Sequence, residues 1–240
     1  MIRAKTIAWI IHGYTASGAV FGVLALIATA QNDIQGAFFY LLIAACIDAT
    51  DGLLARRFKV SEVLPNFSGA YVDNAVDVLT FIFAPIFIIA WVGLLPHILW
   101  IAVPTLAGMY AYGQVDMKTD DHYFLGFPSY WNIVAVYLWW LDLSPTLTVI
   151  AIVIPAVLTF VPTRWLYPSR NTVLWKTTWA LGIPWLLMLG WLLFQDEPER
   201  KWILISLYYP AYYVLASFYI DIRIRMGTKA ATLEGEASPE

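Results

Sequence analysis

Residues 46–78 read CIDATDGLLARRFKVSEVLPNFSGAYVDNAVDV, and this stretch holds four aspartates, Asp48, Asp51, Asp73 and Asp77. The residues before and after it are strongly apolar. A carboxylate near the middle of a membrane helix costs about 2.5–3.5 kcal/mol, so such groups are rarely idle. The stretch therefore indicates a functional site built into a membrane domain.

The overall composition supports the membrane class. Of the 240 residues, 60% are hydrophobic and only 13% are charged, whereas soluble domains are about one quarter charged. The 12 Trp and 14 Tyr residues fit the aromatic belts found at membrane–water interfaces. A formal net charge of −3 argues against nucleic acid as a partner. The single cysteine, Cys46, excludes an internal disulfide and a cysteine-based zinc site.

Apolar segments of membrane-spanning length recur along the chain. A transmembrane helix needs roughly 20 apolar residues, and breaks rich in Pro, Gly or charge separate such segments here. The predicted spans are 7–30, 36–56, 67–92, 96–113, 128–142, 145–163, 175–194 and 202–222. We therefore predict an all-α integral membrane protein with eight transmembrane helices and no soluble domain. Residues 1–226 would form the membrane domain, and 227–240 a polar, disordered cytoplasmic tail.

The basic residues predict the orientation. With the N-terminus in the cytoplasm and eight alternating spans, only Arg200 and Lys201 of the 14 Lys and Arg residues fall outside, which leaves 12 inside. Cytoplasmic loops carry such an excess of Lys and Arg. We therefore expect both termini on the cytoplasmic side.

The spacing of the four aspartates predicts where they meet. Asp48 and Asp51 are three residues apart, and Asp73 and Asp77 are four apart, so each pair shares one helix face. A short cytoplasmic loop joins the two spans, which places all four carboxylates in one pocket open to the cytoplasm. Converging like charges repel one another, and hard divalent cations held by oxygen ligands remove that conflict. The pattern predicts two Mg²⁺ or Mn²⁺ ions of the kind that clamp a transferring phosphoryl group.

Two other interpretations of these acids stay open. Aspartates near the ends of membrane helices are often loop or interfacial residues, and a series of acids can form the pathway of an ion or proton transporter. A relay gives no reason for the residues that accompany the acids, Gly52, Ala55, Arg56 and Gly69. Small residues at such places let two helices approach closely.

The pattern Asp48-x2-Asp51-Gly52-x2-Ala55-Arg56, followed by Gly69-x3-Asp73-x3-Asp77, resembles the signature of the CDP-alcohol phosphotransferase family. All eight fixed positions are present, but the gap of twelve residues between the two halves is longer than in most of the family. The long gap resembles the bacterial branch that makes phosphatidylcholine. Three further stretches are similar to that branch: AWIIHGYTASGAV (8–20), DDHYFLGFPSYWN (120–132) and RWLYPSR (164–170).

The resemblance implies roles for the residues of the motif. The four aspartates would hold two divalent cations, Mn²⁺ or Mg²⁺, and Asp77 would also be the general base. Gly52 and Ala55 would leave room for the cytidine nucleotide, Gly69 would allow its close approach, and Arg56 would meet its phosphates. Family members are commonly homodimers. They transfer a phosphatidyl or similar group from a CDP-linked donor to an alcohol and release CMP.

The resemblance further implies transfer from CDP-diacylglycerol to choline in the bacterial inner membrane, at a site facing the cytoplasm. The nearest alternative is the same chemistry with serine, inositol or glycerol phosphate. Choline carries a quaternary ammonium, which aromatic faces bind with about 0.5–2 kcal/mol per ring. Among the aromatic residues expected on the cytoplasmic side, we predict Tyr123, Trp131 and Tyr167 as the choline site.

Three more residues have two interpretations each. Thr15 lies in the first span at the depth of the predicted pocket, where it would contact the nucleotide or a neighbouring helix. Arg164 and Arg170 flank the sequence WLYPS on the inner face. They would bind the donor phosphates or lipid headgroups, or they would serve as positive anchors at the membrane surface.

Overall fold

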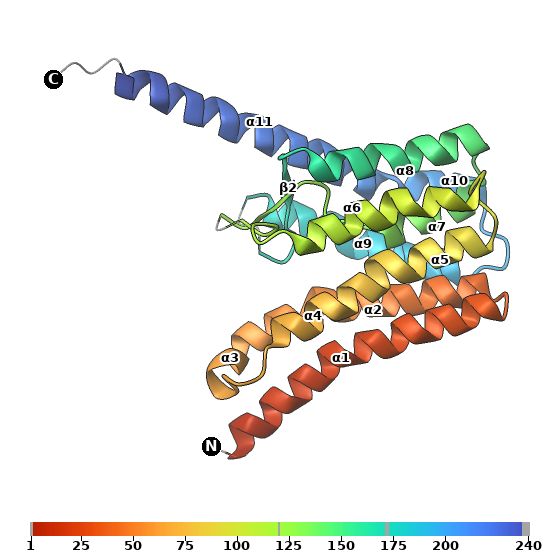
Figure 1. Ribbon diagram of the computed structural model, residues 1–240, viewed down its shortest axis with the longest axis horizontal. Coiled ribbons are helices and arrows are strands. Elements are labelled where there is room, and N and C mark those ends of the chain that lie inside the picture. The colour runs from red at the N-terminus through yellow and green to blue at the C-terminus, as the bar shows by residue number, and fades with distance from the viewer. Residues whose placement is uncertain (1, 120, 171–172, 237–240) are drawn as a thin grey trace.

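The computed structural model describes residues 2–119, 121–170 and 173–236, and most of them are helical (Figure 1). The elements in chain order are α1 (Ile2–Ala30), α2 (Ile34–Arg57), α3 (Val60–Val63), α4 (Gly69–Asp77), the π-helix η1 (Val78–Phe83), α5 (Ala84–Trp91), the 3₁₀ helix η2 (Ile98–Ile101), α6 (Ala102–Gly113), β1 (Tyr123–Leu125), α7 (Trp131–Leu141), α8 (Pro145–Phe160), β2 (Arg164–Leu166), α9 (Trp175–Leu193), α10 (Arg200–Ser206) and α11 (Tyr208–Glu236).

Four helical stretches are long and apolar enough to cross a membrane: Ile2–Ala30, Ile34–Arg57, Gly69–Trp91 and Arg200–Gly227. Shorter apolar helices cover Ile98–Gly113, Trp131–Leu141 and Pro145–Phe160, and α9 coincides with the predicted seventh span. The prediction of a helical membrane protein is therefore confirmed. The count of eight spans and the side on which the termini lie stay predictions.

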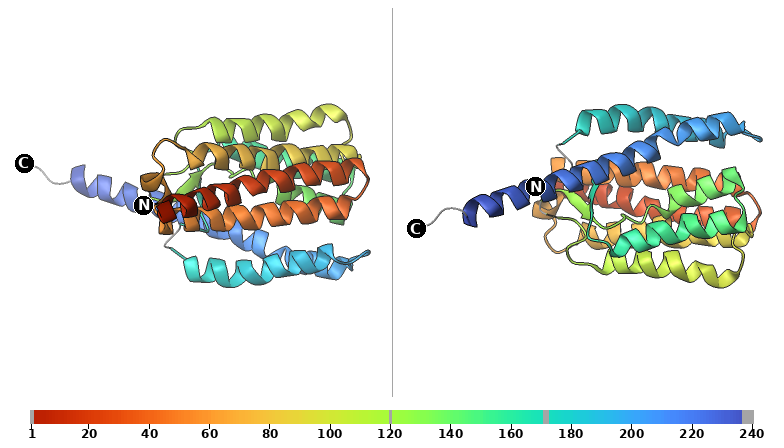
Figure 2. Two further views of the ribbon diagram at one scale, coloured as in Figure 1. Left: turned by 90° about the horizontal axis from the view of Figure 1, so that it is seen from below. Right: turned by 90° about the horizontal axis from the view of Figure 1, so that it is seen from above.

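The helices run along one common direction as an elongated bundle (Figures 1 and 2). The start of α1 and the end of α11 lie at the same end of this bundle, together with α3 and β2. Helix α10, which begins with Arg200 and Lys201, lies at the opposite end. Arg200 and Lys201 therefore lie at the end of the bundle opposite to the start of α1 and the end of α11. The distribution of basic residues in the sequence predicts this separation.

Helix α11 runs past residue 227, the predicted beginning of the polar tail, and ends at Glu236. In Figure 1 its last turns extend beyond the bundle. Residues 237–240 lie outside the described residues, so the disorder of the tail stays a prediction.

The third helical stretch changes its hydrogen-bond register directly after the second pair of aspartates. Between α4 and α5, η1 is a π-helix, and the amide of Ala84 donates to the carbonyl of Leu79, five residues back. Pro85 follows at once and has no amide proton to donate, so the ordinary α pattern cannot continue unbroken here. Short π segments inside α-helices are frequent at functional sites.

Helix α1 packs closely against this stretch because it presents a glycine there. A Cβ atom on Gly18 would lie 2.7 Å from Cγ1 of Val76, which is closer than carbon atoms normally approach. Substitution by a larger residue would push α1 away from α4. The close fit fixes the helix that carries Asp73 and Asp77 against its neighbour.

A two-stranded antiparallel sheet, which the sequence does not predict, joins two of the expected cytoplasmic loops. Strand β1 pairs with β2 so that Phe124 faces Trp165. Strand β2 is held by α11, because the Ser217 hydroxyl accepts a bond from the amide of Leu166 at 3.1 Å and the Tyr213 hydroxyl donates to the Leu166 carbonyl at 2.7 Å. The prediction of an all-α protein is therefore wrong for β1 and β2. The sheet and its bonds to α11 hold the two loops in place.

Candidate active site

The structure brings three of the four predicted aspartates together. Asp48 comes from α2, whereas Asp73 and Asp77 come from α4, and one carboxylate oxygen of each lies within 4.8 Å of the others. Asp51 is buried on α2 and interacts electrostatically with Asp48 and Asp73. Two neighbouring helices therefore direct their acids into one shared space.

The cluster fits a divalent cation. Within the part of the chain that the structure describes, Oδ1 of Asp77 is buried and has no hydrogen-bond partner. A buried carboxylate oxygen without a partner is costly, and a cation held between oxygen ligands removes both this cost and the repulsion between the acids. The donor set of oxygens alone suits Mg²⁺ or Mn²⁺. Asp48, Asp73 and Asp77 could therefore hold a metal ion.

Gly69 at the start of α4 is needed for the packing of His12. A Cβ atom at this glycine would lie 2.8 Å from Cε1 of the His12 ring. That ring also packs on Phe67, with centroids 4.5 Å apart, and its buried Nε2 has no hydrogen-bond partner among the described residues. The absence of a side chain at Gly69 thus lets α1 approach α4, and its role toward a nucleotide stays a prediction.

The other residues of the motif surround the first pair of aspartates. The hydroxyl of Thr15 on α1 interacts with the Asp51 carboxylate, so α1 reaches the site as well. The side chain of Arg56 folds back over Gly52, where Nη1 lies 3.0 Å from the position of an added Cβ. Ala55 packs among the apolar residues between α1 and α3. Roles of these residues in nucleotide binding stay predictions.

Cationic side chains gather around Tyr167 beside the aspartates. Nζ of Lys118 lies 5.7 Å from the centroid of the Tyr167 ring, and Cζ of Arg170 lies 5.8 Å from it. Arg56 interacts electrostatically with both Arg170 and Tyr167. The three cations, Arg56, Lys118 and Arg170, are called the cationic group below. Like charges collected in one place favour an anionic ligand.

Lys118 was not predicted from the sequence, although it is the only Lys or Arg between Gln114 and Gly126. Burial lowers its pKa, but Tyr167 and the carboxylates of Asp73, Asp77 and Asp48 raise it by more, so the net pKa is raised above the ordinary value. The amine is therefore protonated at neutral pH. Its position over the aspartates depends on the fold of the loop, which local sequence does not reveal.

Arg164 differs from the cationic group because it already has acidic partners. Its side chain forms ion pairs with Asp121 at 3.5 Å and with Asp221 at 3.9 Å, and its amide donates to Asp221 at 3.0 Å. These contacts fix β2 to α11. Its predicted contact with phosphate or headgroup stays a prediction, as does that of Arg170.

The predicted choline residues lie in different surroundings. Tyr123 and Trp131 are both buried, and Trp131 packs edge-on against Phe127 with centroids 5.6 Å apart. Neither lines the cavity described next. Tyr167 carries two cations within 6 Å of its ring. The choline roles of these three residues remain predictions without support from their positions.

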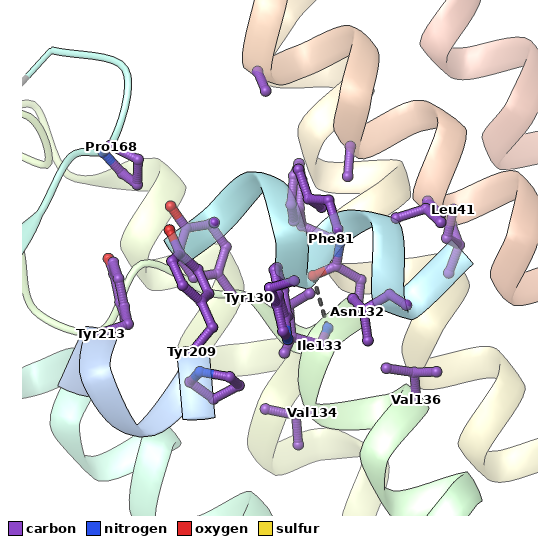
Figure 3. Close-up of a pocket in the computed structure, with 18 of the residues that line it drawn as sticks. Leu41, Phe81, Tyr130, Asn132, Ile133, Val134, Val136, Pro168, Tyr209 and Tyr213 are labelled. Atoms are coloured by element: carbon purple, nitrogen blue, oxygen red, sulfur yellow. Dashed lines mark hydrogen bonds between the residues drawn. The ribbon is translucent and has the colours of Figure 1, made fainter. Parts of the chain in front are cut away.

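A cavity of about 370 Å³ lies between α2, η1, α7, α9 and α11 (Figure 3). Asp48 forms part of its wall. Most of its lining is apolar, including Leu41 from α2 and Leu189 from α9. Tyr130, Tyr209 and Tyr213 line it too, and Figure 3 shows them next to one another. Sequence reasoning missed this cavity because its walls come from helices far apart in the chain.

The family profile of the CDP-alcohol phosphatidyltransferases matches residues 13–161, which include all four aspartates. The chain belongs to the CDP-alcohol phosphatidyltransferase family. The resemblance found from the motif is thereby confirmed. Helices α9, α10 and α11 lie beyond the matched region, and two of them, α9 and α11, supply one wall of the cavity.

Several curated relatives carry the same name. The chain is 37% identical over 210 residues to a phosphatidylcholine synthase of Pseudomonas aeruginosa, which covers 86% of this chain and 88% of that protein. It is 35% identical over 228 residues to a phosphatidylcholine synthase of Legionella pneumophila, which covers 88% of each chain. This CDP-alcohol phosphatidyltransferase is therefore a membrane transferase of phospholipid biosynthesis.

Proposed function

We propose that the protein transfers the phosphatidyl group of CDP-diacylglycerol to choline and so forms phosphatidylcholine and CMP. The observation that carries this proposal is the cluster of Asp48, Asp73 and Asp77 in a chain whose relatives are phosphatidylcholine synthases over most of their length. The same family membership disfavours an ion or proton transporter. Transfer to serine, inositol or glycerol phosphate is the nearest alternative.

The four aspartates, Asp48, Asp51, Asp73 and Asp77, would hold two divalent cations, Mn²⁺ or Mg²⁺. Bound there, the ions would supply charge neutralisation for the pyrophosphate oxygens as CMP leaves. The unpaired Oδ1 of Asp77 and the short separations within the cluster support this assignment.

Asp77 would act on the acceptor. The hydroxyl oxygen of choline attacks the phosphorus that bears the diacylglycerol, the bond from that phosphorus to CMP breaks, and the hydroxyl proton passes to the Asp77 carboxylate. Asp77 is suited to this role because it is buried and lies in one cluster with Asp48 and Asp73. A general base must reach the hydroxyl within hydrogen-bond distance.

The nucleotide end of the donor would lie on the cytoplasmic side of the aspartates. Gly52, Ala55 and Gly69 would leave room for it, and Thr15 would contact it beside Asp51. Its phosphates would meet Arg56, together with the other members of the cationic group. The arrangement of these cations around Tyr167 supports the assignment.

The diacylglycerol tails would enter sideways from the bilayer and occupy the apolar part of the cavity. The shorter helices would complete eight membrane spans, with both termini and the active site on the cytoplasmic side of a bacterial inner membrane. The protein would work as a homodimer, as is common in its family.

The test offers the purified protein labelled choline, serine, inositol and glycerol phosphate in separate reactions, each with CDP-diacylglycerol and Mn²⁺ or Mg²⁺. We expect labelled phospholipid from choline, in an amount equal to the CMP released. Product from serine and none from choline would contradict the proposed acceptor. No product from any of the four would contradict the proposed reaction.

A further inference from the structure

The cavity beside Asp48 has an unusual chemical composition for a place that receives a small polar alcohol. Among the described residues that line it, Asp48 is the only acid, and there is no Lys, Arg or His. The cations of the site gather instead around Tyr167. The cavity therefore offers aromatic faces and one carboxylate, and the three cations of the cationic group are not among its lining residues.

One tyrosine of the cavity wall interacts electrostatically with Asp48, and a second tyrosine of the wall packs on the first. Tyr130, the residue before α7, interacts with the Asp48 carboxylate, and its hydroxyl is a hydrogen-bond partner of Tyr213. The two rings pack at 62° with centroids 5.7 Å apart. Phe81 from η1 packs on the other side of Tyr130 at 6.0 Å. Figure 3 shows Tyr130 and Tyr213 on one side of the pocket.

The hydrogen bond from Tyr213 to the Leu166 carbonyl, 2.7 Å long, fixes the position of its ring. A preorganised ring binds a ligand at a lower entropic cost than a mobile one. The pair thus presents two fixed aromatic faces at an angle, next to a single carboxylate. This is the chemistry that recognises a quaternary ammonium group.

The charge distribution disfavours the competing acceptors. An acceptor with a carboxylate or phosphate needs a cation in its pocket, and the lining of this cavity supplies none. An acceptor with a fixed positive charge and no acid meets no cationic side chain among the described lining residues. In such an alcohol, two carbon atoms separate the ammonium from the hydroxyl, so an ammonium held at Tyr130 leaves the hydroxyl beside the aspartates.

We propose that Tyr130 and Tyr213 bind the trimethylammonium group of the acceptor at the Asp48 end of the cavity and determine the specificity for it. The proposal rests on the proposed function, because it concerns the acceptor of the same reaction. The more distant apolar walls remain available for a lipid tail.

The test measures KM for choline and KM for CDP-diacylglycerol in Tyr130→Phe, Tyr130→Leu and Tyr213→Leu. Phenylalanine keeps the aromatic face and leucine removes it, so we expect Tyr130→Phe to retain a choline KM near that of the wild type. Each leucine variant loses one ring, which predicts a choline KM roughly 2- to 30-fold higher. KM for CDP-diacylglycerol should change little.

Trp140 provides a matched control. It also lines the cavity but lies near the other end of α7, ten residues from Tyr130 and therefore about 15 Å away along the helix. Trp140→Leu removes a ring of similar burial without leaving a hydrogen-bond partner unpaired, because its Nε1 has none in the described part of the chain. We expect its choline KM to stay at the wild-type value.

A second measurement uses 3,3-dimethyl-1-butanol, which has the shape of choline without the charge. We expect the wild type to bind choline much more tightly than this neutral alcohol. Tyr130→Leu and Tyr213→Leu should reduce the ratio of the affinity for choline to the affinity for the neutral alcohol. Where a leucine variant does not accumulate, Tyr213→Met keeps the apolar volume without an aromatic face.

The outcomes separate the two proposals. If the wild type transfers to none of the acceptors, the proposed function fails. If it uses choline, but the leucine variants keep the choline KM and change KM or chain-length preference for CDP-diacylglycerol, then a lipid tail occupies this place and the inference is wrong. Equal binding of choline and the neutral alcohol would overturn it as well.

Discussion

Asp48 on α2 and Asp77 on α4 are 29 residues apart in sequence, and a carboxylate oxygen of one lies within 4.8 Å of a carboxylate oxygen of the other. With Asp73 they form a group whose closest oxygens are within 4.8 Å. Two negative groups at such a separation repel unless a proton or a cation lies between them. The arrangement of α2 and α4 therefore creates a site that needs a cation, as a metal-dependent reaction requires.

Asp77→Asn should abolish turnover and leave the protein folded. Asparagine keeps the shape of the side chain but cannot accept the hydroxyl proton, and losing a general base costs typically 10²–10⁴-fold in rate. The measurement is release of CMP by the purified variant in the presence of choline and CDP-diacylglycerol. Asp142→Asn is the control, since that residue terminates α7 away from the cluster. A rate near that of the wild type for Asp77→Asn would remove the proposed base.

Removal of divalent cations should stop the reaction reversibly. A chelator should reduce phosphatidylcholine formation to background, and added Mn²⁺ or Mg²⁺ should restore it, because the aspartate cluster needs a cation to counter its charge. Asp48→Asn should raise the concentration of Mn²⁺ needed for half-maximal activity by at least tenfold. Full activity in the chelated protein would contradict a metal-dependent site.

Lys118→Gln should weaken binding of the donor more than binding of the acceptor. The raised pKa keeps Lys118 charged, and a hydrogen bond to a charged group contributes about 1.5–3 kcal/mol, which corresponds to roughly 10- to 150-fold in affinity. KM for CDP-diacylglycerol and the inhibition constant of CMP are the quantities to measure. Lys59→Gln is the control, because that side chain is exposed and pairs with Glu62. An unchanged KM for the donor would exclude Lys118 from phosphate binding.

Gly69→Ala should destabilise the protein through His12. The added Cβ would lie 2.8 Å from Cε1 of that ring, and overpacking of this kind typically costs 1–3 kcal/mol. Thermal unfolding in detergent should show a lower midpoint, and His12→Ala in the same chain should recover part of the loss. Gly13→Ala serves as the control, since, apart from its chain neighbours and its own helix backbone, no atom of the described residues lies within 4 Å of its added Cβ.

A different result for Gly69→Ala would identify another role for the glycine. If the midpoint is unchanged and only KM for CDP-diacylglycerol rises, the residue acts on the nucleotide, as the family resemblance implies. If His12→Ala gives no recovery in the double variant, the clash with the imidazole is not the cause of the loss.

The helices and the aspartate cluster could be predicted because both depend on local sequence. Apolar segments of sufficient length are visible in any window, and the i,i+3 and i,i+4 spacing of Asp48, Asp51, Asp73 and Asp77 fixes which faces they share. The basic residues between the apolar segments predict that Arg200 and Lys201 lie apart from the other Lys and Arg residues. In the structure, α10, which begins with these two residues, lies at the end of the bundle opposite to α3 and the start of α1.

The remaining features depend on contacts between distant segments. Strands β1 and β2 are three residues each, and 38 residues lie between them, so neither strand has a recognisable pattern in the sequence. Tyr130 and Tyr213 meet only because α11 packs beside the start of α7. The chain has 14 tyrosines, and nothing in the neighbouring sequence sets these two apart from the others. Lys118 likewise gains its position from the sheet that orders its loop.

The most direct measurement for the central claim is a structure of the protein with Mn²⁺ and CMP, in which the anomalous signal locates the metal. We predict Mn²⁺ between Asp48 on α2 and Asp77 on α4, with the phosphate of CMP turned toward Lys118 and Arg56. Manganese absent from this cluster in a preparation that converts choline and CDP-diacylglycerol to phosphatidylcholine would contradict it.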